Sequence, residues 1–196
     1  MEHYYSEKQS SEFKPAKIKI RLKNDLFEIY SAQGVFSKSK LDIASKLLIE
    51  SSQVPENGDI LDIGCGYGII GISLLRNNSH INITFSDVNE RALELTKMNL
   101  KKLGYKGKVI KSDVFKNISE KYDCILSNPP MAAGRKICFK LIEDAKKHLN
   151  DRGSIQIVAR HQKGGKVLMN KMKDVFGNVD TVAKSSGFRV YKSILK

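Results

Sequence analysis

The chain has 196 residues, of which 41% are hydrophobic and 28% charged, and these values exclude a disordered tail and a membrane protein. The longest apolar run, over residues 69–75, is interrupted by a glycine and a serine, so we expect no membrane span and no secretory signal. The net charge of +13 comes entirely from residues 97–196, which carry 23 basic and 8 acidic residues. This excess indicates either a solubilising lysine coat or a positive face that binds a polyanion such as nucleic acid.

The first predicted elements are a β-hairpin and a helix. Apolar and basic residues alternate strictly over residues 17–23, Asn24-Asp25 interrupts the pattern, and an extended apolar run resumes over residues 26–30. Leucine and alanine residues then recur at helical spacing over residues 41–48, which predicts a helix that ends before Pro55.

From residue 59 onward, predicted strands and helices alternate, which is typical of an α/β fold with a mostly parallel sheet. The last two strands are joined by the turn Ser185-Ser186-Gly187, which permits only an antiparallel pair. We therefore expect a seven-stranded sheet whose last strand is antiparallel, with helices on both faces and ligands at the carboxyl ends of the strands. The strands are predicted over residues 59–63, 81–86, 109–110, 122–126, 154–159, 179–183 and 188–195, and the helices over residues 69–76, 89–103, 138–149 and 167–177.

A glycine-rich turn follows the first strand of this sheet, in the sequence Leu-Asp-Ile-Gly-Cys-Gly-Tyr-Gly over residues 61–68. Its alternating glycines allow a sharp turn and let the backbone approach a ligand where a Cβ atom would collide. Residues 66–71 also match the dinucleotide-binding pattern GxGxxG, and Asp87 lies near the spacing of a ribose-binding carboxylate, which by itself favours a nicotinamide or flavin enzyme. Asp62, directly before the glycines, would repel a pyrophosphate and suits a ligand with a positive charge, such as an amino acid ammonium group.

The whole stretch resembles motif I of the class I S-adenosylmethionine-dependent methyltransferases, which implies this cofactor and a Rossmann-like fold. In that family the acidic residue and the glycines line the methionine part of the cofactor. A carboxylate after the next strand accepts hydrogen bonds from the ribose hydroxyls, and a carboxylate after the third strand accepts a hydrogen bond from the adenine amine. Two alternatives stay open: Asp87 is also a candidate N-cap in a capping box with Glu90, and Asp113 is also interpretable as a loop aspartate in solvent. The resemblance implies as cofactor-binding residues Asp62, Gly64, Cys65, Gly66, Gly68, Asp87, Val88, Asp113, Val114 and Asn128.

A second motif, Ser-Asn-Pro-Pro-Met over residues 127–131, follows the fourth strand. The prolines fix φ and remove two backbone donors, so we expect their carbonyl groups to face outward as acceptors, and Asn128 adds a side-chain carbonyl. Two acceptors that converge on one amino group would aim its lone pair at the methyl group and stabilise charge on the nitrogen. A simple Asn-Pro turn is the structural alternative.

Asn-Pro-Pro at this position resembles the signature of methyltransferases that act on planar amino groups. The resemblance implies catalytic roles for Asn128, Pro129, Pro130 and Met131. Enzymes that methylate glutamine or adenine usually have an aromatic residue where this chain has Met131, and this difference disfavours those two substrates.

The resemblance narrows to the methyltransferase small domain family, whose best-known members are ribosomal small-subunit RNA guanine-N2 methyltransferases. It is carried by His3-Tyr4-Tyr5-Ser6, Gly34-Val35-Phe36-Ser37, Leu41-Asp42 and an Asn-Pro-Pro-x-x-x-Gly motif that ends at Gly134. It implies one methyltransferase domain over residues 1–196 of the short single-domain type, with an N-terminal extension and hairpin over 1–33 and the catalytic core over 34–196. Phe36 either stacks on a base in the active site or is buried in the core.

The expected substrate is the N2 amine of a guanine in ribosomal or other structured RNA, taken out of its stack so that it reaches the methyl group. His161 either touches a phosphate or is simply an exposed loop residue. The alternatives are a protein-glutamine or small-molecule N-methyltransferase, and an RNA-binding scaffold without catalysis. Cations after the fourth and fifth strands are expected to hold flanking phosphates: Arg135, Lys136, Lys140, Arg160 and Lys163.

Cysteine and histidine usage argues against a metal site. Cys65, Cys124 and Cys138 form no CxxC pair and lie near no histidine cluster, which disfavours structural zinc and a disulfide framework. We therefore expect no metal and a location in the reducing cytoplasm. We also expect no membrane partner and a monomer.

Overall fold

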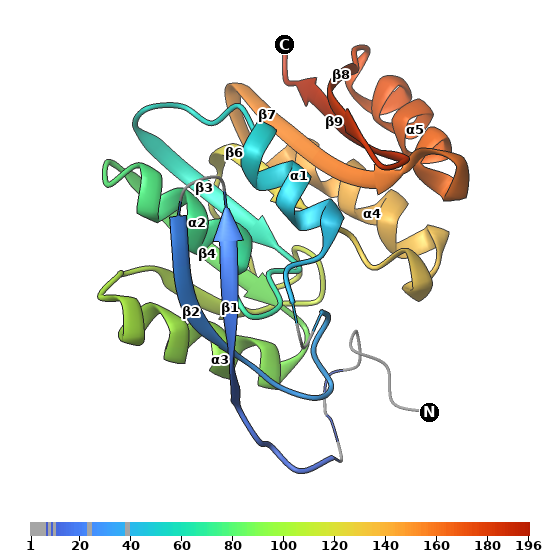
Figure 1. Cartoon of the computed structure of the whole chain (residues 1–196). Helices are drawn as coiled ribbons and strands as arrows, with labels where there is room; N and C mark the ends of the chain where they lie inside the picture. The colour runs from blue at the N-terminus through green and yellow to red at the C-terminus, as the bar shows by residue number, and fades with distance from the viewer. Residues whose placement is uncertain (1–6, 8, 10, 23–24, 38–39) are drawn as a thin grey trace.

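The computed structural model describes residues 7, 9, 11–22, 25–37 and 40–196. Its main body is a seven-stranded sheet in the order β5-β4-β3-β6-β7-β9-β8, and a separate hairpin, β1-β2, lies beside it (Figure 1). The motif His3-Tyr4-Tyr5-Ser6 and the turn residue Asn24 lie outside the described residues. The strands are β1 (Ala16–Leu22), β2 (Asp25–Ser31), β3 (Gly58–Ile63), β4 (Ile81–Asp87), β5 (Lys108–Lys111), β6 (Tyr122–Ser127), β7 (Leu149–Arg160), β8 (Asp180–Ser185) and β9 (Phe188–Ile194).

The directions of the strands agree with the sequence prediction. Neighbouring strands from β5 to β7 are parallel, whereas β9 is antiparallel to both β7 and β8. The central strands β3 and β6 are buried over most of their length because helices cover both of their faces. The carboxyl ends of the parallel strands therefore meet at one edge of the sheet, and the loops that leave this edge are brought together.

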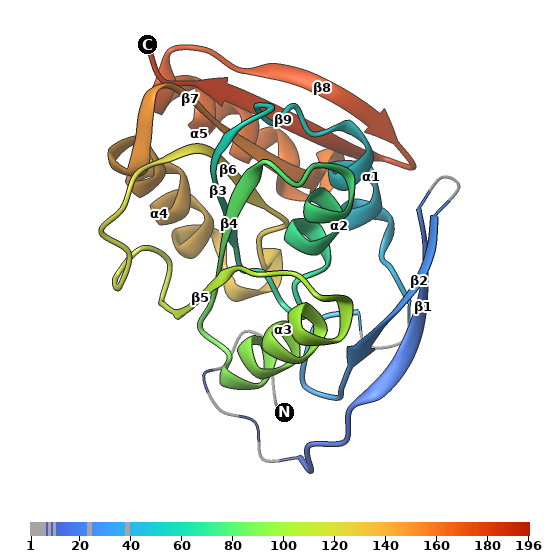
Figure 2. The ribbon, with the colours of Figure 1, turned by 90° about the vertical axis from the view of Figure 1, so that its left-hand side faces the viewer.

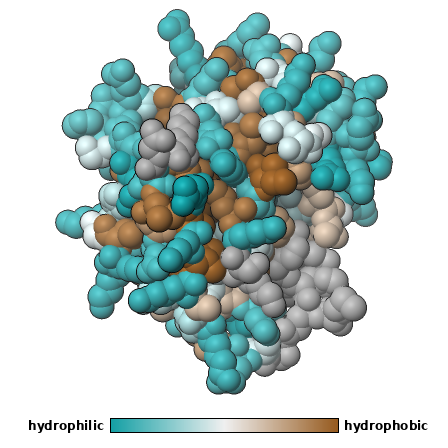
Figure 3. All heavy atoms as spheres, viewed as in Figure 1, coloured by the Kyte–Doolittle hydropathy of each residue, from teal (hydrophilic) through white to brown (hydrophobic). Residues whose placement is uncertain are grey.

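Helices cover both faces of the sheet (Figure 2). α1 (Ile43–Ser51), α2 (Ile69–Asn77) and α3 (Glu90–Leu103) pack on one face with the hairpin, and α4 (Arg135–Ala145) and α5 (Lys166–Phe176) pack on the other. Each face buries its own apolar core, which is the usual arrangement of an α/β domain. On the surface, hydrophilic side chains cover most of the outline, and apolar residues gather toward the middle of the face in Figure 3.

The hairpin is fastened to α2 and α3 by polar contacts. Arg76 of α2 donates from Nε and Nη2 to the two carboxylate oxygens of Asp25 at 2.6 and 2.7 Å. Asn99 of α3 accepts from the backbone N–H of Tyr30 at 2.6 Å and donates to its carbonyl oxygen at 2.9 Å. These bidentate contacts hold the alternating apolar face of the hairpin against the helices.

One predicted element boundary is wrong. The helical spacing predicts Leu149 as part of the helix after β6, whereas Leu149 is the first residue of β7, is fully buried and pairs with Tyr122. A short 3₁₀ turn, Lys146–His148, separates it from α4. An apolar residue four positions after Ala145 fits a helical stripe and the start of a buried strand equally well. In the described part of the chain, no helix has the length and hydropathy that crossing a membrane requires.

Candidate active site

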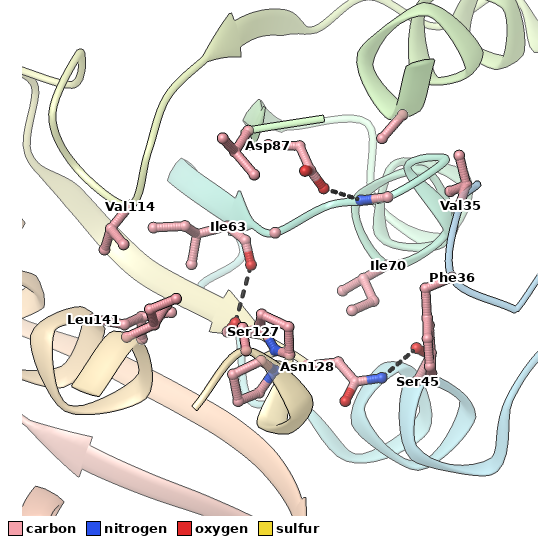
Figure 4. Close-up of a pocket in the computed structure, with 18 of the residues that line it drawn as sticks. Val35, Phe36, Ser45, Ile63, Ile70, Asp87, Val114, Ser127, Asn128 and Leu141 are labelled. Atoms are coloured by element: carbon pink, nitrogen blue, oxygen red, sulfur yellow. Dashed lines mark hydrogen bonds between the residues drawn. The ribbon is translucent and has the colours of Figure 1, made fainter. Parts of the chain in front are cut away.

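A cavity of about 340 Å³ opens at the carboxyl edge of the sheet, where the loops after β3, β4, β5 and β6 meet the start of α1 (Figure 4). Apolar side chains such as Ile63, Ile70 and Leu141 form much of its wall, and a few aspartate, asparagine and serine groups interrupt them. This combination of an apolar wall with few polar groups is typical of a site for a small organic ligand.

The glycine-rich turn is fastened to the end of β4. The N–H groups of Gly64 and Cys65 donate to the carbonyl oxygen of Ser86 at 2.8 and 3.0 Å, and the N–H of Gly66 donates to Asp87 Oδ2 at 2.9 Å. Gly64 and Gly66 have φ values of 71° and 57°, which disfavour residues with a Cβ atom, and both line the cavity. The turn therefore presents bare backbone to a ligand, as the sequence predicts.

Three other residues of this motif do not reach the cavity wall. At Gly68 a Cβ atom would lie 3.0 Å from the side chain of Thr96, and the Sγ of the buried Cys65 lies 3.7 Å from Thr96 Oγ1. Asp62 has no exposed surface, and its Oδ2 accepts from the N–H of Gly71 at 2.9 Å. Burial raises the pKa of Asp62 to about 7. In the structure these residues shape the turn and join it to α2 and α3.

Asp87 ends β4 and lines the cavity. Its Oδ2 accepts from the N–H of Gly66 and its Oδ1 from the N–H of Asn89, both at 2.9 Å. Burial raises the pKa of Asp87, and these N–H groups oppose the shift. The alternative of an N-cap in a capping box with Glu90 is wrong, because Asn89 caps α3 and its Oδ1 accepts from the N–H of Arg91 at 3.0 Å.

The loop after β5 forms the adjoining wall. Val88, Asp113 and Val114 line the cavity there, with the side chain of Asp113 exposed at its rim. The N–H of Ser112 donates to the carbonyl oxygen of Asp87 at 3.0 Å, which joins this loop to the end of β4. Val114 has a φ of 53°, a conformation that costs a β-branched residue about 1–3 kcal/mol. The surrounding contacts therefore hold this part of the wall in a strained shape.

Asn128 is the first residue after β6, and the start of α1 holds its side-chain amide. Its Nδ2 donates to Ser45 Oγ at 3.0 Å (Figure 4) and to Asp42 Oδ1 at 3.3 Å. Asp42 is also the N-cap of α1, since its Oδ1 accepts from the N–H of Ser45 at 2.9 Å. With both donors of the amide engaged, its carbonyl oxygen is the group that Asn128 offers to a ligand in the cavity.

Asp42 and Ser45 both line the cavity, but sequence reasoning gave neither a role in the site and quoted Asp42 only as part of the family motif Leu41-Asp42. The available signal was an aspartate three positions before a serine at the start of an apolar helical pattern, which is typical of an N-cap. The Oδ2 of Asp42 is buried and has no hydrogen-bond partner among the described residues. This oxygen is therefore available to a ligand that donates a hydrogen bond.

The two prolines line the cavity, but one of their carbonyl groups is already engaged. The carbonyl oxygen of Pro130 accepts from the N–H of Ala133 at 2.8 Å in the short turn η1 (Met131–Ala133). The prediction of two outward-facing carbonyl acceptors therefore holds for at most Pro129. Met131 is 37% exposed and does not line the cavity, and its Sδ lies 3.9 Å from Cys138 Sγ.

Two aromatic residues complete the wall near α1. Phe36 lines the cavity and is 40% exposed, so the alternative of a buried core residue is wrong. Tyr67 lines the cavity from the glycine-rich turn and is almost completely buried. Burial, followed by the nearby charge of Asp42, raises the pKa of Tyr67. The side of the cavity beside Asn128 therefore combines aromatic surface with polar groups.

The cations predicted to bind RNA lie on segments that leave the same edge of the sheet. The guanidinium of Arg160 lies 5.0 Å from the centre of the Phe188 ring. Lys140 forms an ion pair with Asp144 of its own helix. The others have exposed side chains: Arg135, Lys136 and Lys163.

No group of three or more histidine, cysteine, aspartate or glutamate side chains in the described ranges is arranged to hold a metal ion. The three cysteines are buried and free. The polar chemistry of the cavity is therefore that of carboxylates, hydroxyls, backbone groups and one oriented amide.

Comparisons with known proteins identify the family of the chain. The family described as methyltransferase small domain matches residues 26–192. The "Uncharacterized protein YbxB" of Bacillus subtilis is 39% identical over 98% of both chains. The ribosomal RNA small subunit methyltransferase C of Hamiltonella defensa is 36% identical over 86% of this chain, which spans 50% of that protein.

Solved structures share the fold at lower identity. The T. thermophilus 16S rRNA N2 guanine methyltransferase RsmC, in complex with AdoMet and guanosine, has a TM-score of 0.81 and 21% identity over 93% of this chain and 51% of that one. A ribosomal protein L11 methylase from Lactobacillus delbrueckii has a TM-score of 0.68 and 18% identity over 91% of this chain and 99% of that one. The predicted Rossmann-like fold is confirmed. On the match over residues 26–192, the chain belongs to the methyltransferase small domain family.

Proposed function

We propose that the chain is an S-adenosylmethionine-dependent methyltransferase of the ribosomal RNA small-subunit type, and that it methylates the exocyclic N2 amine of a guanine. The observation that carries the proposal is the amide of Asn128, whose two donors are both engaged, so that its carbonyl oxygen is offered to a substrate amine. The relatives named ribosomal RNA small subunit methyltransferase C support an RNA substrate. The structural neighbour with AdoMet and guanosine supports guanine.

The cofactor of this site is S-adenosylmethionine, and the residues present fit it. Each oxygen of Asp87 accepts one N–H and has capacity left for ribose hydroxyls, Asp113 at the rim suits the adenine amine, and Gly64 and Gly66 leave room for close approach of the backbone. Asp42 Oδ2 is a further buried acceptor. When bound, the cofactor supplies an electrophilic methyl group on a sulfonium sulfur.

Asn128 orients the substrate amine. Its Oδ1 accepts an N–H of the amine, which fixes the direction of the nitrogen lone pair and stabilises positive charge that develops on this nitrogen. Asp42 and Ser45 prevent the amide from turning, because a flipped amide would present its Nδ2 to the cavity and break both hydrogen bonds. The acceptor is therefore in place before substrate binds.

A guanine in RNA suits this site better than a protein glutamine or a small molecule. The excess of positive charge over residues 97–196 attracts a polyanion. The exposed ring of Phe36 offers a surface on which a base taken out of its helix would stack. Met131 stands where related glutamine and adenine enzymes usually have an aromatic residue. We also propose that the protein works as a monomer in the cytoplasm, where ribosomal RNA is available.

The substrate is tested by incubating the protein with labelled S-adenosylmethionine and either small ribosomal subunits, naked ribosomal RNA or total protein. Nucleoside mass spectrometry is expected to find label in N2-methylguanosine, and Asn128→Ala is expected to abolish it. Label in glutamine, or no label in RNA, would overturn the proposed substrate.

Cofactor binding is tested separately by calorimetry with S-adenosylhomocysteine. We expect micromolar affinity, much weaker binding in Asp87→Ala and no binding of NADH. Tight binding of NADH would instead support the dinucleotide interpretation of the glycine motif.

A further inference from the structure

A second pocket lies outside the cavity, between the end of β7 and the β8–β9 turn. We call it the η3 pocket, after the turn η3 (His161–Gly165) that forms one of its walls. β8 runs in the same direction as β7, so the pocket opens at the carboxyl edge of the sheet, as the cavity does. It is lined by His161, Gln162, Lys184, the turn Ser185-Ser186-Gly187, Phe188 and Arg189.

Cations surround this pocket. Lys184 and Arg189 line the pocket as a pair of facing residues of β8 and β9, and Lys166 directly follows η3 at the start of α5. Desolvation, followed by the charges of Arg189, Lys166 and Lys184, lowers the pKa of His161. None of the ion pairs between described residues involves any of these three cations. Positive charge is therefore concentrated here without a local carboxylate partner, and a bound anion would stabilise it.

The pocket is held in a fixed shape. The N–H of His161 donates to the carbonyl oxygen of Gly187 at 2.9 Å, which joins η3 to the β8–β9 turn. The Nδ1 of His161 lies 2.7 Å from the hydroxyl of Tyr191, a residue that is fully buried. Arg160 packs over the ring of Phe188. These contacts hold η3 against the β8–β9 turn, so the backbone segments that carry Lys184 and Arg189 are fixed beside His161.

The η3 pocket is next to the cavity. Gly164 of η3 is in contact with Met131, since a Cβ atom at Gly164 would lie 2.6 Å from Met131 Cε. Met131 directly follows Pro130, which lines the cavity. Figure 1 shows the connection between β6 and α4 and the connection between β7 and α5 at the same side of the molecule. The turn that forms one wall of the η3 pocket therefore contacts the segment that directly follows the Pro130 wall of the cavity, and both pockets open at the same edge of the sheet.

We propose that the η3 pocket binds a phosphodiester of the RNA strand beside the target nucleotide, through Lys166, Lys184 and Arg189. This inference rests on the proposed RNA substrate. Arg189 supplies a planar donor group that matches two phosphate oxygens, and the lysines supply charge. The pocket extends the expected phosphate contacts from the segments that carry Arg135 and Arg160 to the β8–β9 turn.

The test compares two charge reversals of equal size. Lys184→Glu/Arg189→Glu alters the η3 pocket, and Lys17→Glu/Lys19→Glu alters exposed residues of the hairpin. Fluorescence anisotropy measures binding of labelled small-subunit RNA fragments over a range of salt concentrations, and calorimetry with S-adenosylhomocysteine confirms that each variant is folded. A milder variant, Lys184→Gln/Arg189→Gln, removes the charge without reversing it.

We expect the η3 reversal to weaken RNA binding about tenfold or more, the scale of removing one charge-assisted hydrogen bond, and the hairpin reversal to have a much smaller effect. The slope of log affinity against log salt should fall by about 1 for each phosphate that the variant no longer binds. Equal effects of the two reversals, or an unchanged slope, would overturn the proposed pocket. Competition with orthophosphate distinguishes a strand phosphodiester from a free phosphate. If orthophosphate competes with RNA no better than chloride does at equal ionic strength, the result supports a strand phosphodiester. Specific micromolar binding of orthophosphate that leaves the RNA affinity unchanged overturns the proposal.

The binding experiment does not depend on turnover, so the two proposals fail separately. If the wild type methylates no RNA but the η3 reversal still selectively weakens RNA binding, the pocket binds an RNA phosphate, but both the proposed substrate and the placement of that phosphate beside a target nucleotide are wrong. If RNA is methylated while the η3 reversal changes RNA binding no more than the hairpin reversal does, the proposed pocket is wrong and the proposed substrate is supported.

Discussion

At the residue scale, the site depends on which polar groups are already satisfied by the protein. The amide of Asn128 has its donors engaged by Ser45 and Asp42, which leaves its carbonyl oxygen as an acceptor. Asp87 fastens the glycine-rich turn and still faces the cavity. Asp62 instead is completely buried and ties β3 to α2. Polar side chains of similar chemistry thus have different roles because their burial and their partners differ.

Asn128→Ala is expected to lower turnover about 10²-fold or more and to leave cofactor affinity nearly unchanged, because it removes an acceptor that acts on the substrate amine. Single-turnover methylation and calorimetry with S-adenosylhomocysteine measure the two quantities. Wild-type turnover in this variant would contradict the orientation mechanism.

Ser45→Ala is expected to lower turnover about five- to tenfold, since it removes one of the two acceptors that hold the amide of Asn128. Ser45→Thr keeps the hydroxyl and serves as the matched control with activity close to the wild type. The rate at saturating RNA should change more than KM. If the alanine variant turns over like the threonine variant, Ser45 does not position the amide.

Asp62 is expected to make stability depend on pH. Burial raises its pKa from 3.8 to about 7, so the folded protein keeps a proton that the unfolded chain has released. The stability that this group contributes is fully present below about pH 4 and is lost as the pH rises through 7. Relative to Asp62→Asn, the free energy of unfolding of the wild type should fall by up to about 4 kcal/mol between pH 4 and 8. Urea unfolding of both proteins measures it, and parallel pH curves would disprove the shift.

At the element scale, the site is built where helices begin and strands end. The glycine-rich turn requires α2 to lie close to β4, and Gly71 makes this approach possible. A Cβ atom at Gly71 would lie 2.3 Å from Phe85 Cε1 and 2.9 Å from Ile83 Cγ2. The third glycine of the GxGxxG pattern therefore serves the packing of a helix on a strand, a role that needs no dinucleotide.

Gly71→Ala is expected to destabilise the protein by about 1–3 kcal/mol, because the added methyl group pushes α2 away from β4 and overcomes the better helix propensity of alanine. Asn77→Ala, at an exposed position in the last turn of α2, should change stability by about 0.5 kcal/mol or less. Urea unfolding compares the two variants. A Gly71→Ala protein as stable as the control would mean that Phe85 moves aside without strain.

At the scale of the whole molecule, the edge of the sheet that holds the cavity also gathers cations. Arg135 and Lys136 begin α4, Lys163 lies in η3, and Lys184 is the second-last residue of β8, near the same edge. Phosphate contacts of this kind act together, and the affinity of a protein that engages six to ten phosphates falls about 10³–10⁵-fold between 50 and 200 mM salt. RNA methylation by this protein should therefore be strongly sensitive to salt.

Arg135→Glu/Lys136→Glu is expected to abolish RNA methylation at moderate salt and to spare the binding of S-adenosylhomocysteine, since neither residue lines the cavity. The hairpin reversal Lys17→Glu/Lys19→Glu again serves as the control of equal charge. Activity that is insensitive to salt and to the α4 reversal would favour a small-molecule or protein substrate.

The sequence by itself determined the number of strands in the main sheet, their directions, the glycine-rich turn after β3 and the Asn-Pro-Pro motif after β6. These features follow from local periodicity, from turns too short for a parallel connection, and from residues adjacent in the chain. Only the tertiary structure decided that Ser45 and Asp42 hold the amide of Asn128, because these contacts join residues 83 and 86 positions apart. It also decided the burial of Asp62, the exposure of Phe36 and the gathering of cations at the η3 pocket. Burial and contacts between distant segments depend on how helices pack on the sheet, which local patterns do not specify.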